Sequence, residues 1–82
     1  MTVREACNFL ALNKEVIEVD LKYDNGENAF LGLVYDYNGL NNRSVNEDAM
    51  SKFADCEVIR TETMVDRDDG TICFDLIIAK EG

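Results

Sequence analysis

Carboxylates are the chemically capable groups that this sequence supplies in the greatest number. Asp and Glu number 17 against eight Lys and Arg, and the formal net charge is −9 in 82 residues. Two carboxylates can carry out acid–base catalysis when the fold holds them at a fixed separation. The adjacent pairs Glu47–Asp48 and Asp68–Asp69 do not meet this condition, because neighbouring helical residues face different directions and a turn holds no fixed distance. We therefore predict no catalytic carboxylate pair.

Thiols are the second candidate. The sequence contains no His, which excludes Ser-His-Asp and Cys-His nucleophiles and His-ligated metals. Cys7, Cys56 and Cys73 form no C-x-x-C pair and are odd in number, which fits neither a disulfide framework nor a zinc site. Each lies among apolar neighbours, so we expect buried or half-buried thiols in a cytoplasmic protein. The alternative is a small-ligand-binding domain or cofactorless enzyme that uses one of these cysteines.

The sequence contains no complete motif for a phosphate site or a calcium site. None of the five glycines belongs to a phosphate-binding loop. The stretch 66–70, Asp-Arg-Asp-Asp-Gly, starts like a calcium loop, but Gly70, Thr71 and Ile77 stand where such a loop needs a carboxylate, a glycine and a glutamate. We interpret it as a solvated hairpin turn. The sequence thus predicts no catalytic residue, no cofactor and no metal site.

The helices and strands that must position these side chains can be predicted from capping residues and from the spacing of apolar residues along the chain. A capping box at Thr2–Glu5 predicts a short helix from about Val3 to Leu12, and a second box at Ser44–Glu47 predicts a helix to about Ala54. Residues that alternate between two faces, as at 16–23 and 71–79, and hairpin turns at 24–26 and 66–70 predict four strands joined in pairs. These strands cover Val16 to Tyr23, Asn28 to Asp36, Glu57 to Val65 and Thr71 to Ala79.

The order αββαββ predicts one α+β domain over residues 1–82. We expect a four-stranded antiparallel sheet with two helices on one face. A shift of 42 residues aligns the two capping boxes, and it aligns 15–17 with 57–59, both Glu-Val-Ile. This indicates a tandem repeat of units at about 2–36 and 44–79 with a loop at 37–43, against a chance similarity of two units. A ferredoxin-like fold with its first strand moved to the end has the same order, an analogy that carries no function.

The outward face of the predicted sheet is acidic. We expect carboxylates from three strands to lie there, flanked by those of the second turn. Such a surface repels nucleic acid, so we expect no direct nucleic-acid binding, but it can occupy a basic groove of a partner protein. The alternative is an inert, solvated acidic face. The candidate residues are Glu18, Asp20, Glu62, Asp66, Asp68, Asp69 and Asp75.

The second predicted strand is apolar on both faces. If Phe30 and Val34 face the helices, then Leu31, Leu33 and Tyr35 point away from them. An exposed apolar strip in a small domain indicates a partner or dimer contact, and tyrosines such as Tyr35 and the following Tyr37 are good anchors. The alternative is a central strand that the chain's own loop covers.

In size and charge the chain is similar to the small acidic inhibitors that phages and mobile elements direct against nucleic-acid-binding host proteins. That resemblance includes no motif, so it transfers no residue; it implies a basic, nucleic-acid-binding enzyme as partner. Our first hypothesis is a non-enzymatic, cytoplasmic protein-binding module that inhibits by occupying the basic groove of that partner. The alternative is a structural or accessory subunit that homodimerises through the apolar strand. No segment is apolar for long enough to predict a membrane span.

Overall fold

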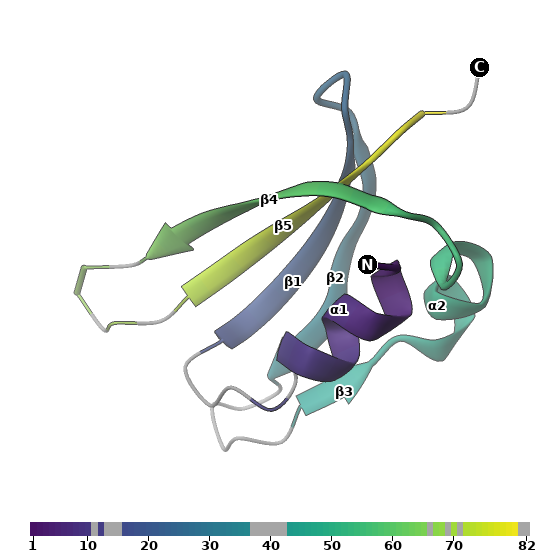
Figure 1. The fold of residues 1–82 in the computed structure, drawn as a ribbon. Helices are drawn as coiled ribbons and strands as arrows, with labels where there is room; N and C mark the ends of the chain where they lie inside the picture. The colour runs from purple at the N-terminus through teal and green to yellow at the C-terminus, as the bar shows by residue number, and fades with distance from the viewer. Residues whose placement is uncertain are drawn as a thin grey trace.

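The computed structural model describes residues 1–10, 12, 16–36, 43–65, 67–68, 70 and 72–80. Within these ranges the chain has an α+β fold of two helices and five strands, which confirms the predicted class (Figure 1). The elements are α1 (Val3–Leu10), β1 (Val16–Tyr23), β2 (Asn28–Asp36), β3 (Arg43–Val45), α2 (Glu47–Phe53), β4 (Val58–Val65) and β5 (Ile72–Ile78). Neither helix is long and apolar enough to cross a membrane.

The sheet is mixed, and its described strands lie in the order β3-β2-β1-β5-β4. β1 pairs with β5 in parallel, whereas β1–β2, β2–β3 and β4–β5 are antiparallel. The prediction of four antiparallel strands is therefore wrong in two respects. Residues 43–45 form an additional short strand on β2, and the two hairpins join through strands that run in the same direction. The ferredoxin analogy is also wrong, because moving its first strand to the end would place the last strand beside the second, not beside the first.

Helix α1 begins at the predicted capping box. The Thr2 amide donates to Glu5 Oε1 at 3.0 Å, and the Glu5 amide donates to Thr2 Oγ1 at 3.3 Å. These bonds satisfy donors at the helix start and lower the pKa of Glu5, first through the backbone bond from Thr2. The helix buries an apolar stripe at helical spacing, formed by Val3, Ala6, Cys7 and Leu10.

Helix α2 begins differently from the prediction. Its N-cap is Asn46, whose Oδ1 accepts a hydrogen bond from the Ala49 amide at 3.1 Å. Ser44, the predicted cap, lies instead in β3 opposite Tyr35. The reason is that Asn caps a helix as well as Ser does, and the extended backbone at Ser44 pairs with β2. The helix consequently starts at Glu47 and buries Ala49 and Met50.

The apolar core lies between the sheet and the two helices. Buried side chains from α1, α2, β1, β2 and β5 form a single cluster. The C-terminal end of β4 and the N-terminal end of β5 extend beyond the helices (Figure 1). Every residue of β4 after Val58 is exposed. The largest fully buried members of the cluster are Leu21, Leu33, Met50 and Leu76.

A bulge interrupts β2 at Gly32. Val19 pairs with Val34 and Leu21 pairs with Phe30, so two steps along β1 correspond to four along β2. Gly32 has φ +77°, a conformation that other residues rarely adopt. The bulge breaks the alternation of sides, so that Leu33 and Val34 are both buried. The predicted outward orientation of Leu33 is therefore wrong.

The two hairpins match the spacing of the predicted repeat. β4 begins at Val58 and ends at Val65, in each case 42 residues after the corresponding end of β1. Gly26 and Gly70, in the two turns, both have positive φ. The surroundings differ, because β1 lies inside the sheet and β4 lies at its edge. Duplication of an ancestral unit stays a hypothesis.

Candidate functional site

Four of the predicted acidic residues lie on the sheet face opposite the helices. Asp75 in β5 is the register partner of Asp20 in β1 on one side and of Glu62 in β4 on the other. Glu18 precedes Asp20 by two residues and therefore shares its face. Three strands thus bring these carboxylates together, which we name the acidic row: Glu18, Asp20, Asp75 and Glu62.

Two cations compensate one half of the acidic row. Lys22 Nζ lies 3.2 Å from Asp75 Oδ2, and Arg60 Nη2 lies 3.6 Å from Glu62 Oε1. Among the described residues, no cationic group forms an ion pair with Glu18 or Asp20. The negative charge of this face is therefore concentrated at the β1 end of the row.

Glu18 stays partly protonated near neutral pH. The hydrogen bond to Asp20 raises the pKa of Glu18 to about 7, and burial and the charges of Asp20 and Asp75 add to this effect. Asp20 Oδ1 also accepts a hydrogen bond from the Gly32 amide at 2.7 Å. A cation placed between the two carboxylates would replace the shared proton.

The predicted apolar anchors border this pair. A shallow cavity of about 440 Å³ lies against the β2 bulge and is lined by Glu18, Phe30, Leu31, Gly32, Tyr35 and Asn46. Leu31 is 58% exposed and Tyr35 is 41% exposed, so both are accessible beside Glu18. Leu33 is fully buried and takes no part in this surface. Tyr37 lies outside the described residues.

The turn after β4 is only partly described. Asp68 is exposed there, and Asp66 and Asp69 lie outside the described residues. The structure therefore places four of the seven predicted carboxylates on one face of the sheet and two of the four predicted apolar anchors beside one of them, Glu18.

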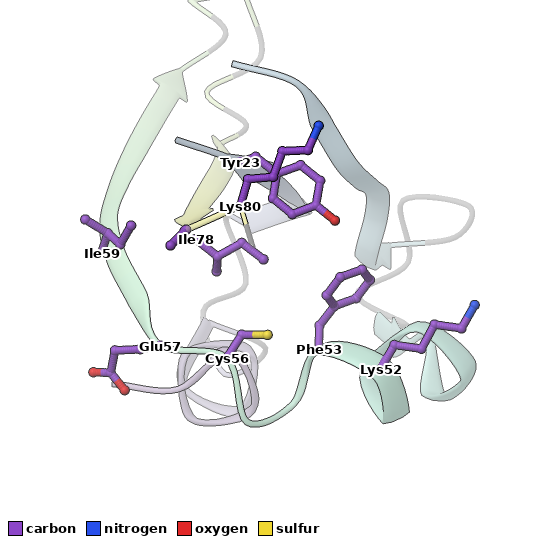
Figure 2. Close-up of a pocket in the computed structure, with 9 residues that line it drawn as sticks. Tyr23, Lys52, Phe53, Cys56, Glu57, Ile59, Ile78 and Lys80 are labelled. Atoms are coloured by element: carbon purple, nitrogen blue, oxygen red, sulfur yellow. The ribbon is translucent and has the colours of Figure 1, made fainter. Parts of the chain in front are cut away.

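A second cavity, of about 450 Å³, was not predicted from the sequence. Figure 2 shows the Cys56 sulfur directed into it, toward Ile78 and Phe53, with Lys80 and Tyr23 on the opposite side. Lys80 Nζ lies 5.6 Å from the centre of the Tyr23 ring and also forms an ion pair with Glu27. None of the predicted partner-binding residues lines this cavity. The sequence signal for it is weak, since half-buried Tyr, Phe and Cys are ordinary core residues.

The thiols have the surroundings that their neighbours predicted. Cys7 is buried, and Cys56 and Cys73 are partly buried. Burial raises the pKa of Cys7 to about 11, so this thiol is protonated at neutral pH and is a poor nucleophile. Within the described part of the chain, no group of three or more Cys, Asp or Glu side chains has the arrangement to hold a metal ion.

Comparison with known proteins identifies no relative of this chain. No protein-family model matches it, and no curated protein and no solved structure is significantly similar to it. What the chain does has to be inferred from the geometry of its described residues.

Proposed function

We propose that this chain is a non-enzymatic binding module for a basic protein, whose nucleic-acid-binding groove it occupies. The observation that carries the proposal is the position of Glu18 and Asp20, which lack an ion-pair partner among the described residues and adjoin the exposed Leu31 and Tyr35. A charged pair beside an apolar anchor has the composition of a protein-binding patch.

Electrostatic steering supports a basic partner. The net charge of −9 on 82 residues creates a negative field that attracts cationic surfaces and repels nucleic acid. Grooves that bind phosphates are lined with Lys and Arg, so the acidic row is complementary to them in charge. Association with such a groove is fast at low ionic strength and weakens as salt is added.

The local geometry favours an arginine as the partner residue at the Glu18–Asp20 pair. A guanidinium group donates several hydrogen bonds in one plane, so it can bridge two carboxylates, and its flat face stacks on an aromatic ring such as that of Tyr35. The bridging cation displaces the proton that Glu18 holds. Affinity is therefore expected to rise between about pH 6 and about pH 8.

The proposal places the module in the cytoplasm, which suits a sequence whose three cysteines match no disulfide framework. It acts there by competition, as an inhibitor of the kind that phages and mobile elements produce. No reaction is assigned to it.

The test is a pull-down from nuclease-treated extract at about 50 mM and about 500 mM salt. The double variant Glu18→Gln/Asp20→Asn replaces two carboxyl groups by amides and keeps the side-chain shapes. The matched control, Glu47→Gln/Asp48→Asn, makes the same changes at exposed positions of α2. Each captured protein is then produced alone and titrated in the presence and absence of its nucleic acid.

The expected result is a basic partner that is retained at low salt, weakened at high salt and competed by nucleic acid. The variant Glu18→Gln/Asp20→Asn should lose this partner, and the control Glu47→Gln/Asp48→Asn should keep it. A partner that both variants bind equally, or that nucleic acid does not displace, contradicts the proposal.

A further inference from the structure

We propose that two copies of this chain pair edge to edge through β4, antiparallel to each other, with a two-fold axis at Thr61. The two sheets would then form one continuous sheet across the dimer. This interface differs from the predicted dimer through the second strand, which is unavailable because β2 lies between β1 and β3.

β4 is an accessible edge. Within the described part of the chain its single strand neighbour is β5, and its residues from Ile59 to Val65 are all exposed. Its outer edge is covered at the first residue, where the Val58 amide donates to the Met1 carbonyl, so the edge is open from Ile59 onward. The outer row of backbone N–H and C=O groups of such a strand is a template for another strand. The opposite edge of the sheet, β3, is only three residues long.

The usual protections of an edge strand are weak here. Pairing with β5 is regular from Arg60 to Val65, with a register shift only between Val58 and Arg60. The strand contains no Pro and no Lys. It also exposes large apolar side chains, with Ile59 at 53%, Met64 at 71% and Val65 at 58%. In a chain of net charge −9, the strand carries one Arg and one Glu and is neutral.

Strand geometry leaves few ways in which β4 can pair with itself. Residues opposite each other in an antiparallel ladder share a face. Each allowed register therefore places one residue of β4 directly opposite its own copy, and the two-fold axis lies between these two copies. An axis at Arg60 or at Glu62 places like charges directly opposite each other, which is destabilising. An axis at Thr63 places Glu62 opposite Met64 of the second copy.

The axis at Thr61 gives complementary contacts. Arg60 then lies opposite Glu62 of the second copy, and symmetry repeats this pair. Both side chains are on the outer face, because their β5 partners are Ile77 and Asp75. Thr61 meets its own copy on the other face, and threonine pairs are favourable across strands. The charge pattern of the strand is therefore self-complementary in this one register.

The experiment exchanges charge between two copies. Arg60→Glu makes the outer face of β4 carry Glu at both positions, and Glu62→Arg makes it carry Arg at both. Each single variant places like charges opposite each other in its own dimer, whereas a mixture pairs Glu with Arg at both contacts. Sedimentation equilibrium from low to high micromolar concentration measures self-association of each variant and of the mixture. Circular dichroism checks that the variants are folded.

We expect the wild type to dimerise, each single variant to dimerise at least about ten-fold more weakly, and the mixture to form the heterodimer with affinity near that of the wild type. The control uses Lys80→Glu and Glu27→Lys, an exposed ion pair outside β4, with the same changes in net charge. Both control variants should dimerise as the wild type does. A wild type that is monomeric at high micromolar concentration, or single variants that dimerise normally, would overturn the proposal.

Discussion

The carboxylate of Asp20 in β1 accepts a hydrogen bond from the amide of Gly32 in β2 at 2.7 Å. This bond links the acidic row on the outer face to the bulge that directs Leu33 into the core. The amide of Asn46, at the start of α2, in turn donates to the carbonyl of Leu33 at 2.9 Å. The candidate surface and the packing beneath it therefore depend on the same few residues.

The first prediction concerns this bond. Asp20→Asn and Asp20→Ala remove the same charge, but only the asparagine retains an oxygen that can accept from Gly32. We expect the alanine variant to be less stable than the asparagine variant by about 1–2 kcal/mol, because a bulge amide loses its partner. Urea unfolding of the two variants at neutral pH measures the difference. Equal midpoints would show that the bond does not hold the bulge.

The second prediction separates two neighbouring leucines of β2. Leu33→Ala should cost about 2–5 kcal/mol, because it leaves a cavity in the core. Leu31→Ala should change stability by less than about 0.5 kcal/mol, because its side chain is 58% exposed. Thermal unfolding tests both. Under the proposed function, Leu31→Ala should also weaken partner binding, whereas a stable Leu33→Ala protein would contradict the position of Leu33 in the core.

The third prediction follows from the raised pKa of Glu18. Because this pKa is about 7 in the folded chain and about 4.5 for an ordinary glutamate, the folded state binds more protons than the unfolded state between these values. Glu18 therefore lowers stability as pH rises through that window. Glu18→Gln, whose amide can donate to Asp20 at any pH, should remove this loss.

The measurement is the free energy of unfolding at about pH 5 and about pH 8. Glu62→Gln is the control, since it removes the same charge from the same face away from the Glu18–Asp20 pair. Glu5 and Glu27 do not interfere with this comparison. Their lowered pKa values add stability to the folded state, and this stability is lost only as pH falls below about 4.5. If Glu18→Gln keeps the wild-type slope, the two carboxylates do not share a proton.

The fourth prediction distinguishes the observed cap of α2 from the predicted one. Asn46→Ala removes the acceptor for the Ala49 amide and should cost about 1 kcal/mol. Ser44→Ala changes an exposed residue of β3 and should have little effect on helix stability. Denaturant midpoints of the two variants give the comparison. A larger loss for Ser44→Ala would restore the capping box that the sequence indicated.

Local signals in the sequence predicted local structure well. The box at Thr2–Glu5 gave the start of α1, and the alternation at 16–23 gave the full extent of β1. Alternation also placed Glu18, Asp20, Asp75 and Glu62 on one face, because residues two apart in a strand share a side.

Other features depend on contacts between distant residues. The parallel pairing of β1 with β5 has no local sequence signature, and β3 is too short for periodicity to show. Gly32 is a local signal for the inward direction of Leu33, since a glycine within a strand is a sign of a bulge. The ion pair of Lys22 with Asp75 joins β1 to β5, so its prediction required the sheet register, whereas Arg60 and Glu62 lie two residues apart on one strand.

The order β3-β2-β1-β5-β4 places the first hairpin between elements that come later in the chain. On a ribosome, β1 and β2 are made before the other strands. The strands that pair with the two edges of this hairpin, β3 and β5, follow only with residues 43–45 and 72–78. Contacts between such distant segments form slowly, and unpaired strands are prone to aggregate meanwhile. We therefore expect the newly made chain to need its last strand before the first hairpin is protected, so that a chain ending before β5 would be a substrate for chaperones and proteases.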